Sequence, residues 1–144
     1  MELRASLRQK YLLIENESNS IDGNTTDQEN VKSKINIFDQ KFIDKVEAVI
    51  EKNLMNEEFG VNDLGDELGY SRMQLYRKLK FVTNFSANEF IRSYRLKKSA
   101  SLLLESDMNI TEILYEVGFS NRSYYAKCFK LKYGKSPREY KEQH

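Results

Sequence analysis

Two segments of this sequence, residues 61–80 and 110–130, follow the same pattern. The first reads V-N-D-L-G-D-E-L-G-Y-S-R-M-Q-L-Y-R-K-L-K and the second I-T-E-I-L-Y-E-V-G-F-S-N-R-S-Y-Y-A-K-C-F-K. Each begins with apolar residues at helical spacing and reaches a glycine, an aromatic residue and a serine. A basic stretch without acidic residues then follows. A short helix, a glycine turn and a second helix make a helix-turn-helix, so the sequence predicts this motif twice.

Composition limits what else the chain can be. It has 144 residues, of which 40% are hydrophobic and 31% charged, which fits one domain of roughly 100 residues plus a tail. No apolar run approaches the roughly 18 residues of a membrane span, and residues 1–13 lack the apolar core of a signal peptide. The single cysteine, Cys128, cannot form an internal disulfide. These features predict a cytoplasmic protein with no membrane partner.

The net charge of +1 conceals an uneven distribution. Residues 39–70 carry 3 basic and 9 acidic side chains, whereas residues 71–144 carry 15 basic and 7 acidic ones. A basic half in an otherwise neutral chain is typical of a protein that binds a polyanion.

The pattern along the chain predicts an all-α fold. Residues 1–15 have the spacing of a short helix, residues 16–38 are polar and are expected to form a flexible linker, and residues 39–144 form the folded domain. Within that domain we expect seven helices, which form two helix-turn-helix lobes joined by a long central helix at residues 87–104. The other six expected helices span residues 39–54, 61–68, 72–83, 109–117, 121–133 and 137–143.

Residue types at the expected helix ends support these boundaries. Side chains that can cap a helix N-terminus stand at Asp39, Ser71, Ser86, Asn109, Ser120 and Ser136. Glycines stand where three helices should end, at Gly69, Gly118 and Gly134. Inward-facing stripes are predicted at Leu75, Leu79 and Val82, at Tyr125, Phe129 and Tyr133, and along the central helix at Phe90, Ile91, Tyr94, Ala100, Leu103 and Leu104.

The outward faces of the two basic helices carry side chains suited to DNA. Arginine can bond guanine bidentately, glutamine can do so with adenine, and a helix N-terminus can receive a phosphate. The candidate DNA-binding residues are Ser71, Arg72, Met73, Gln74, Tyr76, Arg77 and Lys80 in the first unit, and Asn121, Arg122, Ser123, Ala126, Lys127 and Lys130 in the second. The predicted partner is therefore double-stranded DNA, contacted in adjacent major grooves.

These residues resemble the AraC/XylS family of bacterial transcription regulators. The stretch E-V-G-F-S-N-R-S-Y-Y-A-K-C-F-K-L-K-Y-G-K-S-P-R-E-Y, residues 116–140, is similar to the family signature, and the resemblance covers roughly residues 39–141. It implies two recognition helices held about one DNA turn apart, roughly 34 Å. It also implies activation of transcription and contact with RNA polymerase. One departure is Lys127, where many members carry arginine, so the second lobe is expected to contribute mainly phosphate contacts.

The first unit and the segments S-A-N-E-F-I-R-S-Y-R-L and L-L-E-S-D-M-N-I-T-E-I also resemble the output domain of hybrid two-component regulators. In those proteins a sensor kinase, a receiver and this domain share one chain, and residues 1–15 resemble the segment that follows the receiver. The resemblance implies a phosphorelay output domain that is a monomer in isolation and a dimer in the full-length protein.

Three other functions compete with this interpretation. An enzyme is disfavoured because the only histidine is the terminal His144, and the sequence has no phosphate-binding glycine loop and no metal-spaced Cys/His set. We therefore expect no catalytic residues, no metal and no cofactor. An autonomous one-domain regulator differs only in what precedes the domain. A helical protein-interaction module is the remaining alternative, and weak dependence of its binding on salt would distinguish it from a DNA-binding protein.

Overall fold

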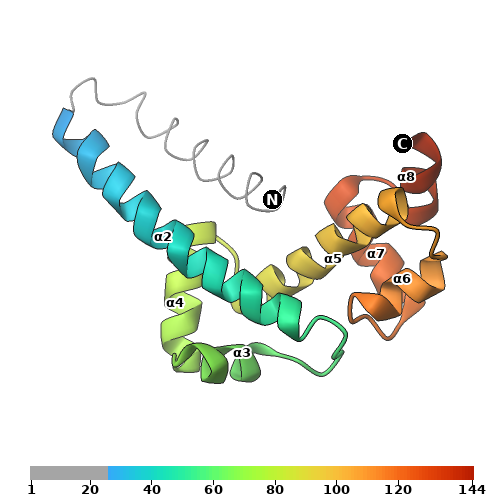
Figure 1. Ribbon diagram of the computed structural model, residues 1–144, viewed down its shortest axis with the longest axis horizontal. Coiled ribbons are helices and arrows are strands. Elements are labelled where there is room, and N and C mark those ends of the chain that lie inside the picture. Colours follow the sequence, from blue (N-terminus) through green and yellow to red (C-terminus); the bar gives the residue numbers. More distant parts are fainter. Residues whose placement is uncertain (1–25) are drawn as a thin grey trace.

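The computed structural model describes residues 26–144, with side chains from residue 37 onward, and within this range every regular element is a helix. Figure 1 shows their arrangement. The seven helices are α2 (Thr26–Lys52), α3 (Val61–Leu68), α4 (Arg72–Thr83), α5 (Ala87–Glu105), α6 (Ile110–Glu116), α7 (Arg122–Tyr133) and α8 (Pro137–Gln143). The predicted all-α fold with two helix-turn-helix lobes on a long central helix, α5, is confirmed.

The start of α2 differs from the sequence prediction. Residues 26–38, expected to belong to a linker over 16–38, are the first half of a helix that continues to Lys52. Asp39 therefore lies inside this helix and does not cap it. The sequence from 26 to 52 contains no proline or glycine, so nothing interrupts the helix once its packed second half has formed. The rest of the expected linker and the expected helix at 1–15 lie outside the described residues.

The first lobe consists of α2, α3, α4 and the beginning of α5. Its core includes Val46 and Ile50 from α2, Leu64 from α3, and Leu75 and Leu79 from α4, all fully buried. Val82 and Phe90 are also buried there, so the stripes predicted for α4 and the start of α5 are confirmed.

The second lobe consists of the remainder of α5 with α6, α7 and α8. Tyr125 and Phe129 are fully buried, and aromatic rings continue the core towards α8, where the Phe129 and Tyr140 centroids are 5.4 Å apart. Tyr133 is partly buried against the same cluster. Leu104 was predicted to face inward but is 45% exposed, because the buried face of α5 at this point runs through its neighbour Leu103, which is 2% exposed.

The two helix-turn-helix turns are closed in the same way, with one difference. In the first, Gly69 adopts φ 77°, and Ser71 Oγ accepts a hydrogen bond from Gln74 N at 3.2 Å. In the second, Gly118 adopts φ 88°, but the cap of α7 is Asn121, whose Oδ1 accepts from Tyr124 N at 2.9 Å. Counted from the glycine to the cap, the second turn is thus one residue longer, and Ser120 is not the cap that the serine repeat predicted. The predicted caps Ser86, Asn109 and Ser136 are confirmed.

A buried arginine of α5 connects the two lobes. Arg95 is only 5% exposed, and its guanidinium donates to the carbonyl oxygens of Leu54, Asn56 (2.9 Å) and Val117 (2.7 Å). Two of these carbonyls follow α2 in the first lobe and the third follows α6 in the second. Burial lowers the pKa of Arg95 from its ordinary value, and the three carbonyls provide the partners that a buried cation requires.

Candidate nucleic-acid interface

The outer face of α4 presents the first set of predicted DNA-binding residues to solvent. All seven are exposed, namely Ser71, Arg72, Met73, Gln74, Tyr76, Arg77 and Lys80. Two large side chains with apolar surface are among them, Met73 at 58% and Tyr76 at 46% exposure, and neither is covered by the core of the lobe. Because α4 contains no acidic residue, nothing on its own surface offsets its positive charge.

Gln74 has a second role that limits its first. Its Oε1 accepts a hydrogen bond from Ser71 N at 2.9 Å and so completes the capping box of α4. Bidentate recognition of adenine uses both the oxygen and the nitrogen of a glutamine amide. Gln74 must therefore release the cap to recognise adenine in that way.

The outer face of α7 presents the second set. Asn121, Arg122, Ser123, Lys127 and Lys130 are exposed, and Ala126 is half-buried. Arg122 Nη1 donates to Thr111 Oγ1 at 3.1 Å, which holds this side chain against α6. The side chain of Asn121 is used in the cap, so its contribution to DNA binding is chiefly to order the first turn of α7.

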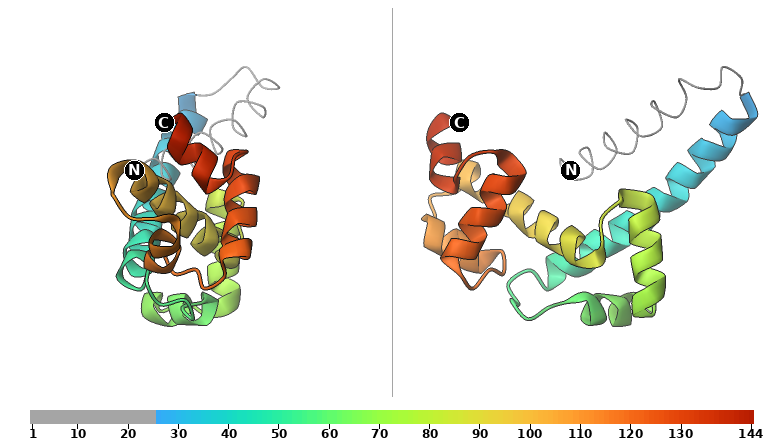
Figure 2. Two further views of the ribbon diagram at one scale, coloured as in Figure 1. Left: turned by 90° about the vertical axis from the view of Figure 1, so that its right-hand side faces the viewer. Right: turned by 180° about the vertical axis from the view of Figure 1, so that it is seen from behind.

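The two basic helices lie on the same side of the central helix. Figure 2 shows α4 and α7 near opposite ends of α5, with α2 on its other side. Each helix packs its apolar stripe onto a different part of α5, so the central helix determines how far apart their outer faces lie. The arrangement therefore presents two basic surfaces to a single extended partner.

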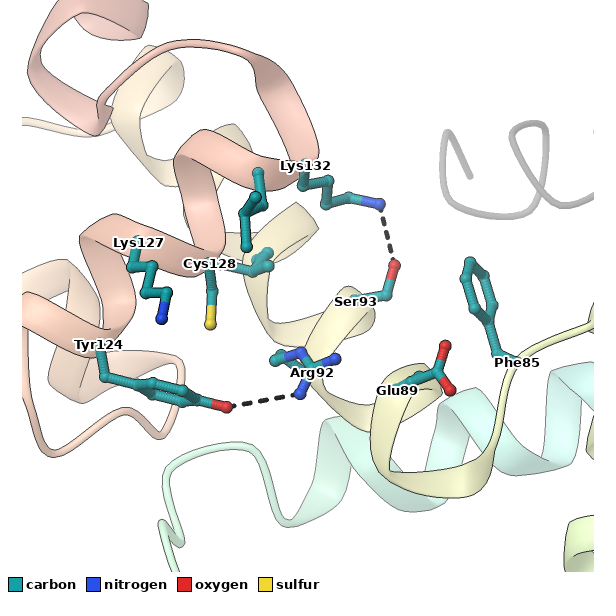
Figure 3. A pocket seen from close by; sticks show the side chains of 10 residues that line it. Phe85, Glu89, Arg92, Ser93, Tyr124, Lys127, Cys128 and Lys132 are labelled. Atoms are coloured by element: carbon teal, nitrogen blue, oxygen red, sulfur yellow. Dashed lines mark hydrogen bonds between the residues drawn. The ribbon is translucent and has the colours of Figure 1, made fainter.

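A hollow of about 400 Å³ separates α5 from α7 on this side. Figure 3 shows Arg92 Nη1 donating to Tyr124 Oη at 3.4 Å across it, and Lys132 Nζ donating to Ser93 Oγ at 2.9 Å. Sequence reasoning did not single out Arg92 or Lys132 as site residues. The signal for Arg92 was its basic side chain on the helix that joins the two units.

Two further features can be stated for the part of the chain that the structure describes. The side chains of residues 37–144 include no group of histidine, cysteine and acidic residues placed to hold a metal ion. Among the same residues, no helix combines the length and the apolar character needed to cross a bilayer.

The fold and the two exposed basic helices define a double helix-turn-helix domain. A family model described as a helix-turn-helix domain matches residues 64–143. The chain belongs to this family, in its AraC-type form.

Relatives and a solved structure agree with this assignment. Histidine kinase P4 of Formosa agariphila is 40% identical over 110 residues, which are 76% of this chain and 8% of the relative. The Msm operon regulatory protein of Streptococcus mutans is 35% identical over 96 residues, 64% of this chain and 34% of the relative. The chain thus spans a minor part of both relatives. The C-terminal domain of AraT, a response regulator of Geobacillus stearothermophilus, superposes with a TM-score of 0.64 and 25% identity, covering 71% of this chain and 84% of that one.

Proposed function

We propose that the chain is a sequence-specific DNA-binding regulator that activates transcription. The observation that carries this proposal is the placement of two exposed, basic, acid-free helices on one side of α5. Family membership supports DNA as the polyanion, since the matched region includes both helices of the second motif and the recognition helix of the first.

Each lobe has a distinct part in this proposal. In the first, Arg72 and Arg77 contact base edges in one major groove, with Met73 and Tyr76 against thymine methyl groups. In the second, Lys127 and Lys130 contact mainly phosphates, because lysine lacks the planar fork with which arginine bonds a base pair edge. Specificity then comes chiefly from α4, and affinity from both helices.

The experiment that tests this function is selection of bound duplexes from a random library, followed by titration of the selected duplex against salt. A bipartite motif with halves about ten base pairs apart is expected, since successive major grooves on one side of B-DNA have that spacing. About six neutralised phosphates give a log–log salt slope near −5. Absence of both enrichment and salt dependence would remove DNA binding and favour a protein-interaction module.

We further propose that this domain is the output part of a two-component phosphorelay in the cytoplasm. The support is the 40% identity to part of a histidine kinase and the similarity to the C-terminal domain of a response regulator. The test is the reading frame that encodes the chain. A kinase and a receiver upstream of residue 1 would support the proposal, whereas a start codon at Met1 preceded by a stop codon would favour an autonomous regulator.

The sign of regulation and the partners require a functional assay. A promoter that carries the selected motif is transcribed in vitro by purified RNA polymerase, with and without the protein. Increased transcript supports activation through polymerase contact, and decreased transcript supports repression. Sedimentation of the isolated domain is expected to give a monomer, with dimerisation dependent on the rest of the full-length protein.

A further inference from the structure

The hollow between α5 and α7 extends along α5 to the loop that follows α4. Its lining includes Phe85, which follows α4, and Lys127 on α7, with Arg92 and Ser93 of α5 between them. We name this feature the central groove. A second hollow of about 390 Å³ adjoins it and shares Arg92 and Tyr124, so these two side chains stand at the middle of the surface between the lobes.

The charges of the central groove favour an anion. Its lining contains three basic side chains, Arg92, Lys127 and Lys132, and one acidic side chain, Glu89. Glu89 lies in the first turn of α5, where its Oε1 accepts a hydrogen bond from Ser86 Oγ at 3.0 Å. Within residues 37–144, neither Arg92 nor Lys127 forms an ion pair with a carboxylate.

Arg92 is held in place without an ion pair to any carboxylate of residues 37–144, although Glu89 lines the same hollow and Glu57 lines the adjoining one. Its side chain is half-buried, and its Nη1 donates to Tyr124 Oη. A guanidinium has five donor hydrogens in a rigid fork, so one bond to a hydroxyl leaves most of them available to a planar or tetrahedral oxyanion. Figure 3 shows Arg92 and Lys127 bordering the same hollow from different helices.

A duplex bound by both lobes must cross this groove. Successive major grooves that face one side of B-DNA are separated by a minor groove, and its two edges are phosphate backbones. Figure 2 shows α5 running between α4 and α7, so with α4 in one major groove and α7 in the next, the DNA backbone between the two grooves would pass over α5. The chemistry of Arg92 matches the phosphodiesters that this segment presents.

We propose that Arg92 is a DNA-contacting residue of the central helix, which binds a phosphate of the duplex segment between the two half-sites, and that Tyr124 positions its guanidinium. This inference rests on the proposed DNA-binding function. It assigns a third contact region to the domain, one that adds affinity without adding base preference.

The first test compares Arg92→Ala with Arg138→Ala by measuring affinity for the selected duplex over a range of salt concentrations. Arg138 is the matched control because it is an exposed arginine on α8, paired with Glu142 at 3.2 Å. Arg92→Ala should weaken binding by about tenfold and reduce the steepness of the salt slope by about 0.9, the value of one phosphate. The selected motif should not change. Arg138→Ala should leave both quantities at their wild-type values.

The second test replaces single phosphates in the central segment with uncharged methylphosphonates. Wild-type protein should lose affinity at one central position, and Arg92→Ala should lose no more there, because its partner is already absent. Tyr124→Phe should weaken binding less than Arg92→Ala and keep the wild-type slope. If Arg92→Ala lowers the melting temperature, Arg92→Lys decides the matter, since it retains the charge and should retain the slope.

The proposal would be overturned if Arg92→Ala bound like Arg138→Ala, or if a methylphosphonate at the sensitive central position reduced the affinity of Arg92→Ala as much as it reduces that of wild-type protein. Failure of DNA binding itself is a different result. It would appear as an absence of salt-dependent binding by the wild-type chain, before any variant is compared.

Discussion

Gly118 lies where the second lobe packs against Arg95 and Leu54, and there is no room for a side chain at this position. Its φ of 88° is a left-handed conformation that side chains other than glycine rarely adopt. A Cβ at this position would lie 1.3 Å from Arg95 Nη1 and 2.3 Å from the carbonyl oxygen of Leu54. Any other residue would therefore displace the arginine that joins the lobes and strain the turn before α7.

Gly118→Ala is expected to lower the free energy of unfolding by about 3 to 5 kcal/mol, since left-handed strain and steric overlap add. Urea denaturation followed by circular dichroism measures the loss. Gly134→Ala is the matched control, because Gly134 has φ 76° but no atom within 4 Å of where a methyl group would stand, so only the conformational cost of about 1 to 2 kcal/mol remains. Equal losses in the two variants would show that the contact with Arg95 contributes nothing.

Tyr125 gives the second lobe a dependence on alkaline pH. Burial raises the pKa of its hydroxyl to about 12, with the neighbouring Ser99 hydroxyl partly offsetting the rise. In the unfolded chain this group ionises near its ordinary pKa of 10.0. Below pH 10 the Tyr125 hydroxyl is protonated in both the folded and the unfolded state. As the pH rises from 10 towards 12, it loses its proton in the unfolded state only, so the free energy of unfolding falls.

The free energy of unfolding of wild-type protein should therefore fall by about 2 to 3 kcal/mol between pH 10 and pH 12 on account of Tyr125. Tyr125→Phe should remove that share of the decline, while every other ionisable group is common to both proteins. Urea titrations of the two proteins at intervals of pH provide the comparison. If the free energies of unfolding of the two proteins fell in parallel with pH, Tyr125 would have the same pKa in the folded and the unfolded state.

At the scale of elements, α4 and α7 both expose basic residues, but of different kinds. Arg72 and Arg77 are exposed on α4, whereas α7 exposes Lys127, Lys130 and one arginine, Arg122, which is already bonded to Thr111 of α6. Removal of one side chain is therefore expected to change base preference when it lies on α4 and overall affinity when it lies on α7.

Arg77→Ala should relax the base preference at one half-site, with the other half unchanged, since a bidentate contact to a base is worth about 1 to 3 kcal/mol of discrimination. Lys130→Ala should weaken binding to all duplexes alike and reduce the steepness of the salt slope by about one. Library selection and salt titration of both variants separate these effects. An unchanged motif for Arg77→Ala would refute the assignment of α4 as the base-recognising helix.

The ends of the elements explain how much of the fold could be predicted. The bounds of α4 follow directly from the sequence because Ser71 caps its start and Asn84, at φ 64°, ends it. The start of α2 could not be predicted, since a polar stretch without proline or glycine is compatible with both a linker and a solvated helix. The cap of α7 was misplaced because the repeat with the first unit favoured Ser120, and the extra residue in the second turn is not evident from the pattern.

The part of the candidate site that could be predicted from the sequence is the set of residues on the outer face of each helix. The exposed residues of α4 follow from the spacing of Leu75, Leu79 and Val82, and their exposure is confirmed. The function of Arg95 was not predictable, because its three partners come from two separate loops and accept through backbone carbonyls that any residue provides. The available signal was an arginine four residues after buried Ile91, on the inward stripe of α5.

At the scale of the whole molecule, the domain has two cores with few connections between them. Buried residues up to Tyr94 belong to the first core and those from Leu96 onward belong to the second. Leu54 packs against both, and Arg95 lies between them with hydrogen bonds to each lobe. The angle between the lobes, and hence the separation of α4 and α7, depends on α5, Leu54 and Arg95.

Arg95→Met is expected to loosen this angle while leaving each lobe folded, because three carbonyls lose their donor but neither core loses an apolar group. Selected duplexes should keep both half-motifs and show a broader distribution of the spacing between them. Lys98→Met is the matched control on the same helix, as Lys98 makes a partly exposed ion pair with Glu51 at 3.3 Å and lies over the Tyr94 ring, both within the first lobe. A spacing as narrow as that of the control would show that α5 and Leu54 alone fix the lobes, whereas loss of one half-motif altogether would mean that the second lobe requires Arg95 to fold.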